Sequence, residues 1–163
     1  SSKVSFEVHD YKSSKAKELD VSDAPTILFE SHPNVRFLGI PSGHEFAAFM
    51  QSLSYASGRD VMLNDRVKEV VKAIDKDVHI RVFVTPTCPY CPSMVHLAQA
   101  MAFLNPRIRA EMVEAIEYRK LAEEWNVNAV PKIVINGKVG FEGAVPQDVF
   151  LEYLLDGLEG ERA

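Results

Sequence analysis

The chain has 163 residues, of which 47% are hydrophobic and 25% charged, an ordinary globular composition that suffices for one large domain or two small ones. Its net charge of −5 is spread over both halves, which excludes electrostatic nucleic-acid binding as the main activity. No apolar run approaches the roughly 18 residues that span a membrane, so we expect no membrane partner.

The first part of the chain carries signals for one strand and two helices. Val4, Phe6 and Val8 alternate with polar residues, and this alternation predicts a strand over residues 4–8. A helix is expected over residues 45–54. A linker near residues 56–60 then leads to a second helix at residues 65–74, where apolar side chains recur at helical spacing.

The remaining elements alternate between strands and helices. Strands are predicted at residues 78–84, 108–114 and 131–135, the last joined through the Asn136-Gly137 turn to a strand at 138–141. Helices are predicted at residues 92–104, 117–125 and 147–158. This order implies an α/β fold with a mixed sheet and helices on both of its faces.

Both cysteines lie in one motif, Cys88-Pro89-Tyr90-Cys91. A scaffold of several disulfides and a four-cysteine zinc site are therefore excluded. A mixed zinc site would need two histidines, and His79 and His96, the two nearest the motif, lack ligand spacing, so we expect no metal. Two interpretations remain: the cysteines form a redox-active pair, or they are chemically inert. A redox-active pair needs no cofactor, because its own disulfide is the redox group.

The motif lies between a predicted strand and a predicted helix. The amides and dipole at a helix N-terminus stabilise a thiolate, so Cys88 is expected to be the low-pKa attacking thiol. Cys91 lies one turn deeper and is expected to resolve the mixed disulfide. Pro89 stiffens the loop, and Tyr90 is expected to shield the sulfurs or donate to them.

Cys88-Pro89-Tyr90-Cys91 at a strand-to-helix turn, followed later by Val130-Pro131 before a hairpin, resembles the thioredoxin fold, and the tetrad is typical of glutaredoxins. The residues alone leave open that Pro131 is only the first residue of a strand. The resemblance implies instead a cis-proline packed against the cysteine pair. It also implies that the backbone of Val130 pairs with a substrate chain.

The chain contains an internal repeat. Residues 21–27 match residues 127–133, and residues 37–41 are similar to residues 141–146. We therefore expect two tandem thioredoxin-like units: residues 61–163 form a complete one, and residues 1–60 form the C-terminal part of the first. Its first strand, its active-site loop with the CxxC and its first helix are expected to be missing. Either the chain is an N-terminally shortened fragment, which we favour, or its first unit is degenerate.

Two such units in tandem resemble the protein disulfide oxidoreductases of thermophilic archaea and bacteria. The similarity is carried by residues 82–92, 112–118 and 129–135. That family usually has a second CxxC in its first unit, which this chain lacks. The N-terminal domain of the alkyl hydroperoxide reductase flavoprotein subunit is also similar, at Gly43-His44-Glu45-Phe46 and at residues 104–108, and it has one CxxC.

The resemblance implies a cytoplasmic thiol-disulfide oxidoreductase that reduces, oxidises or isomerises protein disulfides, with thioredoxin reductase as its expected reductant. Two alternatives remain: a dithiol relay from a flavin reductase to a peroxiredoxin, and a non-catalytic binding module. Residues 78–87 contain no acidic residue, so the proton acceptor for Cys91 is left unassigned. His96 could carry protons, but we expect a surface or satisfied histidine, and Lys132 faces either the thiols or solvent.

Overall fold

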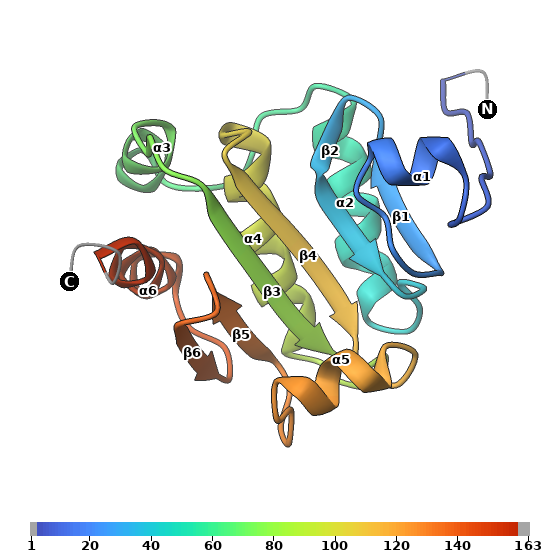
Figure 1. Cartoon of the computed structure of the whole chain (residues 1–163). Coiled ribbons are helices and arrows are strands. Elements are labelled where there is room, and N and C mark those ends of the chain that lie inside the picture. The colour runs from blue at the N-terminus through green and yellow to red at the C-terminus, as the bar shows by residue number, and fades with distance from the viewer. Residues whose placement is uncertain (1–2, 160–163) are drawn as a thin grey trace.

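The computed structural model describes residues 3–159. They form one six-stranded sheet and six helices (Figure 1). The strands are β1 Thr26–Phe29, β2 His32–Leu38, β3 Val78–Val84, β4 Ile108–Glu114, β5 Lys132–Ile135 and β6 Val139–Glu142. The helices are α1 Ser14–Glu18, α2 Glu45–Ala56, α3 Asp65–Lys72, α4 Cys91–Leu104, α5 Arg119–Glu124 and α6 Gln147–Glu159.

The sheet is mixed, as predicted, with the strand order β1-β2-β4-β3-β5-β6. The three central strands β2, β4 and β3 run parallel, so their C-terminal ends meet at one edge of the sheet. The hairpins β1–β2 and β5–β6 supply antiparallel strands on the two flanks (Figure 1). Although β3 and β4 are central strands, only one face of each is apolar throughout: on the other face, polar side chains pair with one another, namely His79, Arg81, Arg109 and Glu111.

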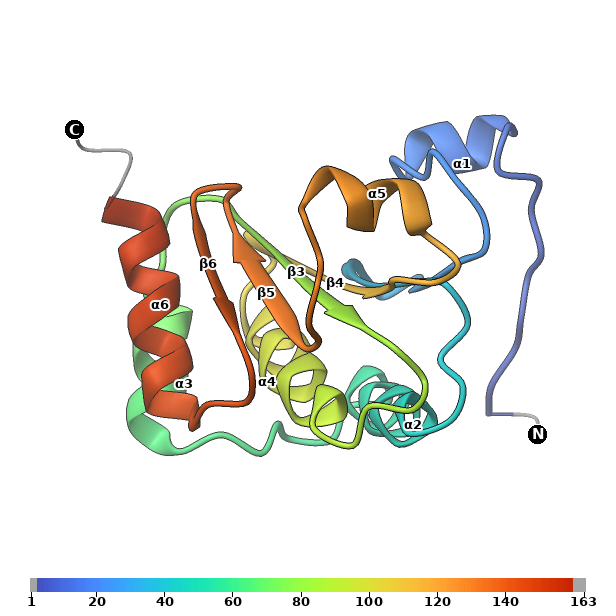
Figure 2. The same cartoon turned by 90° about the horizontal axis from the view of Figure 1, so that it is seen from below.

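Helices cover both faces of the sheet, as expected. Figure 2 shows α2, α3, α4 and α6 on one face and α1 and α5 on the other. Helix α4 packs on the middle of the sheet, with α2 on one side of it and α3 and α6 on the other (Figure 2). Most of its side chains are therefore buried, and not only those of one stripe. This central position holds the N-terminus of α4 rigidly at the C-terminal end of β3.

The internal repeat is visible in the structure. A cis-proline precedes each hairpin, Pro25 before β1 and Pro131 before β5. In each copy the proline carbonyl accepts a hydrogen bond from a glycine amide, from Gly39 at 2.8 Å and from Gly143 at 2.9 Å. A short helix also comes before each proline, α1 in the first copy and α5 in the second. The two halves therefore share a common hairpin unit.

Two sequence-based predictions need correction. Residues 4–8 form no strand, and Phe6 and Val8 are exposed, because the alternating pattern has no partner strand beside it. Helix α1 was not predicted. It is a single short segment whose first turn is capped by the Ser13 hydroxyl, which accepts from the Ala16 amide.

Most other boundaries shift by one or two residues. Helix α5 begins only at Arg119, because the amides of Ile116 and Glu117 donate to the Glu114 carboxylate at 3.0 and 2.9 Å and turn the chain first. Strand β5 begins after Pro131, which has no N–H to donate to a ladder.

Candidate functional site

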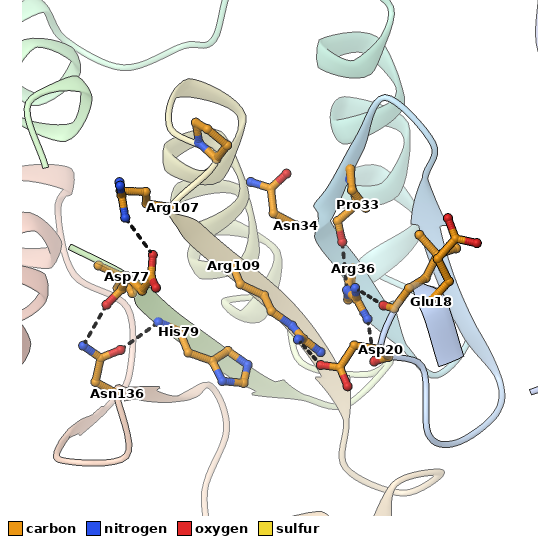
Figure 3. A pocket seen from close by; sticks show the side chains of 13 residues that line it. Glu18, Asp20, Pro33, Asn34, Arg36, Asp77, His79, Arg107, Arg109 and Asn136 are labelled. Carbon is orange, nitrogen blue, oxygen red and sulfur yellow. Dashed lines mark hydrogen bonds and ion pairs between the residues drawn. The ribbon is translucent and has the colours of Figure 1, made fainter. Parts of the chain in front are cut away.

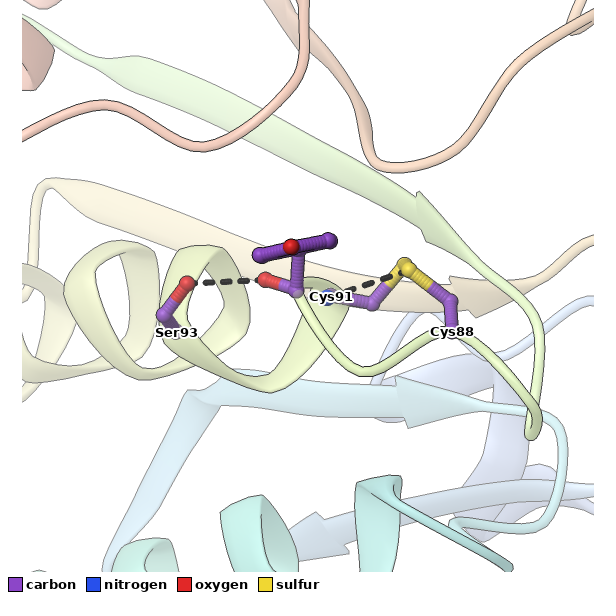
Figure 4. The surroundings of a disulfide bond; sticks show 4 residues. Cys88, Cys91 and Ser93 are labelled. Atoms are coloured by element: carbon purple, nitrogen blue, oxygen red, sulfur yellow. Dashed lines mark hydrogen bonds between the residues drawn. A yellow bond between two sulfur atoms is a disulfide. The ribbon is translucent and has the colours of Figure 1, made fainter.

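The cysteine pair lies at the N-terminus of α4, beyond the C-terminal end of β3. Cys88 and Cys91 are joined by a disulfide, with their Cα atoms 5.5 Å apart. The Cys91 amide donates to the Cys88 sulfur at 3.2 Å (Figure 4). Cys88 is 9% exposed and Cys91 is fully buried. A reacting partner can therefore reach only the sulfur of Cys88.

The two residues between the cysteines face outward. Pro89 is exposed, and Tyr90 is 68% exposed. The Tyr90 carbonyl accepts a hydrogen bond from the Ser93 hydroxyl at 2.7 Å, within the first turn of α4 (Figure 4). This turn keeps the loop short and presents the Tyr90 ring at the surface beside Cys88.

Val130 and Pro131 lie before β5. The peptide bond between them is cis, as the resemblance implied, and Pro131 is buried. Val130 is half-buried and packs against the core cluster that contains both cysteines. Among residues 3–159, no hydrogen bond occupies the backbone N–H or C=O of Val130. That peptide group is available to another chain.

Lys132 takes neither of the two orientations considered for it. Its Nζ donates to the carbonyl of Trp125 at 2.7 Å and to that of Asn126 at 3.3 Å. These carbonyls lie at the C-terminal end of α5, where a cation is favoured. Lys132 therefore caps a helix and does not act on the thiols.

Glu45 is an acidic residue at the site that the sequence interpretation did not assign. It begins α2, is only 1% exposed, and neither carboxylate oxygen has a hydrogen-bond partner within the described structure. Burial raises the pKa of this carboxyl to about 8. A carboxyl with this pKa is mostly protonated, and so uncharged, at pH 7, and it ionises as the pH rises to about 8.

The start of α2 is attached to the loop that leads into Cys88. The His44 amide donates to the Pro86 carbonyl at 3.0 Å. Gly43 has φ +58°, and a Cβ at this position would lie 2.4 Å from the same oxygen. Only glycine therefore permits this contact. It places the first turn of α2, and with it Glu45, against the active-site loop. Glu45 precedes the cysteines by a long stretch of chain, so its only sequence signal was the Gly43–Phe46 similarity.

His96 is a satisfied core histidine, as expected. Its Nε2 lies 2.6 Å from the hydroxyl of Tyr55, and burial lowers its pKa. The same hydroxyl accepts from the Met62 amide at 3.1 Å. His96 thus joins α4 to α2 and has no direct link to the sulfurs among these bonds.

A cluster of charged residues lies on the face of the sheet that carries α1 and α5. Burial favours a raised pKa for Glu111, but the hydrogen bond from His79 and the charges of His79, Arg109 and Arg81 outweigh it and lower the pKa to about 2. Arg109 also pairs with Asp20 at 2.6 Å. These mutual pairs give the cluster a structural role, holding the sheet to the segment after α1.

A hollow of about 540 Å³ adjoins this cluster (Figure 3). Its lining includes Asp77 and His79 at the start of β3 and Arg107 and Arg109 at the start of β4. It therefore lies at the end of the sheet opposite the disulfide. Arg107 pairs with Asp77 at 3.2 Å, so its charges are matched internally.

Two further kinds of site are absent from the described part of the chain. Within residues 3–159, no three His, Cys, Asp or Glu side chains are grouped so as to hold a metal ion. None of the helices in this range has the length and apolar character needed to cross a membrane.

Comparison with known structures finds the same architecture. A protein disulfide oxidoreductase from Aeropyrum pernix superposes with a TM-score of 0.84 and 36% identity, covering 92% of this chain and 67% of that one. The NTD_N/C domain of alkyl hydroperoxide reductase AhpF from Enterococcus faecalis gives 0.79 and 26%, covering 88% and 72%. The thioredoxin domain family matches residues 78–156.

Similar sequences occur within longer proteins. A Bacillus subtilis protein named NADH dehydrogenase is 32% identical over 125 residues, which are 77% of this chain and 25% of that protein. In Staphylococcus aureus, the F component of alkyl hydroperoxide reductase is 32% identical over 64% of this chain and 20% of its own length. The chain therefore spans about a quarter or less of these relatives.

Proposed function

Because the chain belongs to the tandem thioredoxin-fold protein disulfide oxidoreductases, which are related to the N-terminal domain of alkyl hydroperoxide reductase AhpF, we propose that it exchanges disulfides with other proteins through Cys88 and Cys91. The observation that carries this proposal is the unequal burial of the two sulfurs. Cys88 borders solvent and Cys91 is fully buried. The sulfur of Cys88 can therefore contact a substrate disulfide, whereas the sulfur of Cys91 lies buried behind it.

Cys88 is the attacking residue in this proposal. In the reduced protein its thiolate lies at the N-terminus of α4, where the Cys91 amide points toward it and the helix dipole stabilises negative charge. The thiolate attacks a substrate disulfide, a Cys88–substrate disulfide forms, and the first substrate thiolate leaves.

Cys91 completes the exchange. It must lose its proton before it attacks the Cys88 sulfur, which closes the Cys88–Cys91 bond and releases the second substrate thiolate. We propose that this proton passes to the Glu45 carboxyl in its ionised form, which is the minor form at neutral pH because burial raises its pKa to about 8. This carboxyl is buried beside the active-site loop and has no other partner among the described groups, and its share of ionised molecules grows as the pH rises toward 8. In total, two electrons pass from the dithiol to the substrate.

The other site residues bind and shape the substrate in this proposal. The unpaired peptide group of Val130 pairs with the substrate backbone, and Pro131 supports it from below. Pro89 and Tyr90 form the exposed side of the loop. The boundary proposed near residue 60 assigns Glu45 to the first unit and the cysteines to the second, so the two units share one site.

After each exchange the Cys88–Cys91 disulfide must be reduced again, and we propose that a cytoplasmic thioredoxin reductase supplies the electrons. A second candidate function is supported by the structural match to the alkyl hydroperoxide reductase domain at a TM-score of 0.79. In that case the pair relays electrons from a flavin reductase to a peroxiredoxin. Turnover that requires a peroxiredoxin and is absent with general protein disulfides would favour the relay.

The test is a set of cysteine variants assayed for the reduction of insulin disulfides. Cys91→Ser should accumulate a mixed disulfide with insulin, visible as a reducible band shift, because the resolving thiol is missing. Cys88→Ser should give neither turnover nor the adduct. Full turnover by Cys88→Ser would overturn the proposal, and absence of turnover in the wild type as well would favour a binding module. The reduction potential should fall near the glutaredoxin range of about −200 to −230 mV.

A further inference from the structure

The segment between α5 and β5 carries the peptide group that the proposed function assigns to substrate binding. Residues 126–131, which we call the cis-proline loop, contain Val130. Lys132, the first residue of β5, pairs with Phe83 near the end of β3, the strand that leads to Cys88. Figure 2 shows the loop running from α5 to the start of β5. Any movement of this loop therefore moves the Val130 peptide relative to the cysteine pair.

The first part of the cis-proline loop is fixed by the end of α5. Asn126 has a φ of +51°, the left-handed conformation that often ends a helix. The Asn126 amide donates to the Glu123 carbonyl at 3.1 Å, and the Val127 amide donates to the Ala122 carbonyl at 3.0 Å. Beyond Val127 this support stops, since within the described structure no backbone–backbone hydrogen bond involves residues 128–130. The position of these residues thus depends on contacts made by side chains.

Lys132 closes the loop from its other end. Its Nζ donates to the Trp125 carbonyl at 2.7 Å and to the Asn126 carbonyl at 3.3 Å, so one ammonium group bridges the two ends of the loop. The Asn126 carbonyl also accepts from the Asn128 side-chain amide at 3.2 Å. Hydrogen bonds from charged donors are stronger than those from neutral ones, so the ammonium group is the stronger of these two ties.

The Trp125 end of this bridge is firmly anchored. The Trp125 ring packs against the turn between β5 and β6, where an added Cβ on Gly137 would lie 3.3 Å from it. The guanidinium of Arg81, on β3, lies 5.9 Å from the centroid of the same ring. Lys132 therefore ties the cis-proline loop to a fixed point of the fold.

We propose that Lys132 is a positioning residue: its ammonium group holds residues 128–130 so that the Val130 peptide faces a substrate backbone. This inference rests on the proposed function. Without the bridge these residues gain conformational freedom, and a substrate chain must order them again when it binds. The loss falls on substrate binding, because the ammonium group bonds to carbonyls at the end of α5 and not to either sulfur.

The experiment compares lysine variants with two disulfide substrates. Lys132→Met removes the ammonium group and keeps most of the apolar stem, whereas Lys132→Arg keeps a positive charge that can donate to both carbonyls. Lys120→Met is the matched control, since Lys120 is an exposed lysine on α5 outside the loop. The substrates are insulin, whose chain can pair with Val130, and 2-hydroxyethyl disulfide, which has no peptide chain.

We expect Lys132→Met to raise KM for insulin about tenfold and to leave kcat within about twofold, since binding and not the exchange step loses support. Values for the small disulfide should stay within about twofold of wild type. Lys132→Arg should restore most of the insulin KM, and Lys120→Met should match wild type. Asn128→Ala removes the weaker tie to the Asn126 carbonyl and should raise the insulin KM about threefold.

An insulin KM within about twofold of wild type in Lys132→Met would overturn the inference, even with a lower melting temperature, because the lysine would then only stabilise the fold. An equal loss with both substrates would also overturn it, because the lysine would then act on the cysteines. So would a Lys120→Met variant as impaired as Lys132→Met. If Lys132→Met does not fold, an unchanged insulin KM in Asn128→Ala overturns the inference instead. Absence of wild-type turnover with both substrates would refute the proposed function itself.

Discussion

The buried carboxyl of Glu45 makes a quantitative prediction about stability and pH. In the unfolded chain its pKa is near 4.5, and in the folded protein burial raises it to about 8. Between these values the unfolded state releases the proton and the folded state keeps it, so folding becomes less favourable as pH rises. The free energy of unfolding is therefore highest below pH 4.5, where both states hold the proton, and it has fallen by the full amount once the pH exceeds about 8. At about 1.4 kcal/mol for each unit of pKa, the full loss is about 5 kcal/mol.

Glu45→Gln tests this magnitude because it keeps the size of the side chain and removes the ionisation. Urea unfolding of the oxidised wild type should be compared with that of the oxidised variant at pH 5, 6, 7 and 8. The contributions of all other titrating groups then cancel in the difference between the two free energies of unfolding. We expect the wild type to lose stability relative to Glu45→Gln steadily with pH, by several kcal/mol at pH 8. A difference that is constant within about 0.5 kcal/mol over this range, well below the slope that linkage requires, would refute the reasoning.

Three further substitutions test the architecture. Glu111→Gln removes the buried carboxylate that His79, Arg81 and Arg109 share and should cost about 3 kcal/mol at pH 7. Because the folded pKa of Glu111 is lowered to about 2, that cost should shrink as the pH of urea unfolding falls from 4.5 toward 2. Gly43→Ala should destabilise the protein by about 1–3 kcal/mol and slow insulin reduction, because a Cβ would meet the Pro86 carbonyl and displace α2. Asn105→Ala should lower the melting temperature by removing two buried hydrogen bonds to carbonyls at the end of α3, at a cost of about 1–3 kcal/mol; an unchanged melting temperature would contradict this role.

The site combines the two copies of the repeat asymmetrically. The second copy supplies the cysteines, at the junction of β3 and α4. The first supplies a buried acid, Glu45, at the start of α2. The link between them is the contact of Gly43 and His44 with Pro86. This contact explains how a half without a CxxC can take part in the chemistry proposed here.

From residue 45 onward, the order of elements followed from the sequence alone, as did the position of the cysteine pair. Both depend on local signals: β-branched runs, helical spacing, and the Pro and Gly residues that end elements. The strand at residues 78–84, the turn with Cys88 and the helix after it form one continuous segment. The repeat, too, was readable, because it recurs in the same order of residues, and the structure bears it out in two matching hairpins.

Three features depended on contacts between distant parts of the chain. The alternation at residues 4–8 formed no strand, because a strand needs a neighbour that the local pattern does not specify. Lys132 turned to the end of α5, which the sequence could not place against β5. Glu45 reached the active-site loop only through the packing of α2 on α4 and the close approach of Gly43 to Pro86. Local residue patterns encode which elements form, but the burial that shifts a pKa or exposes a surface arises only when those elements pack together.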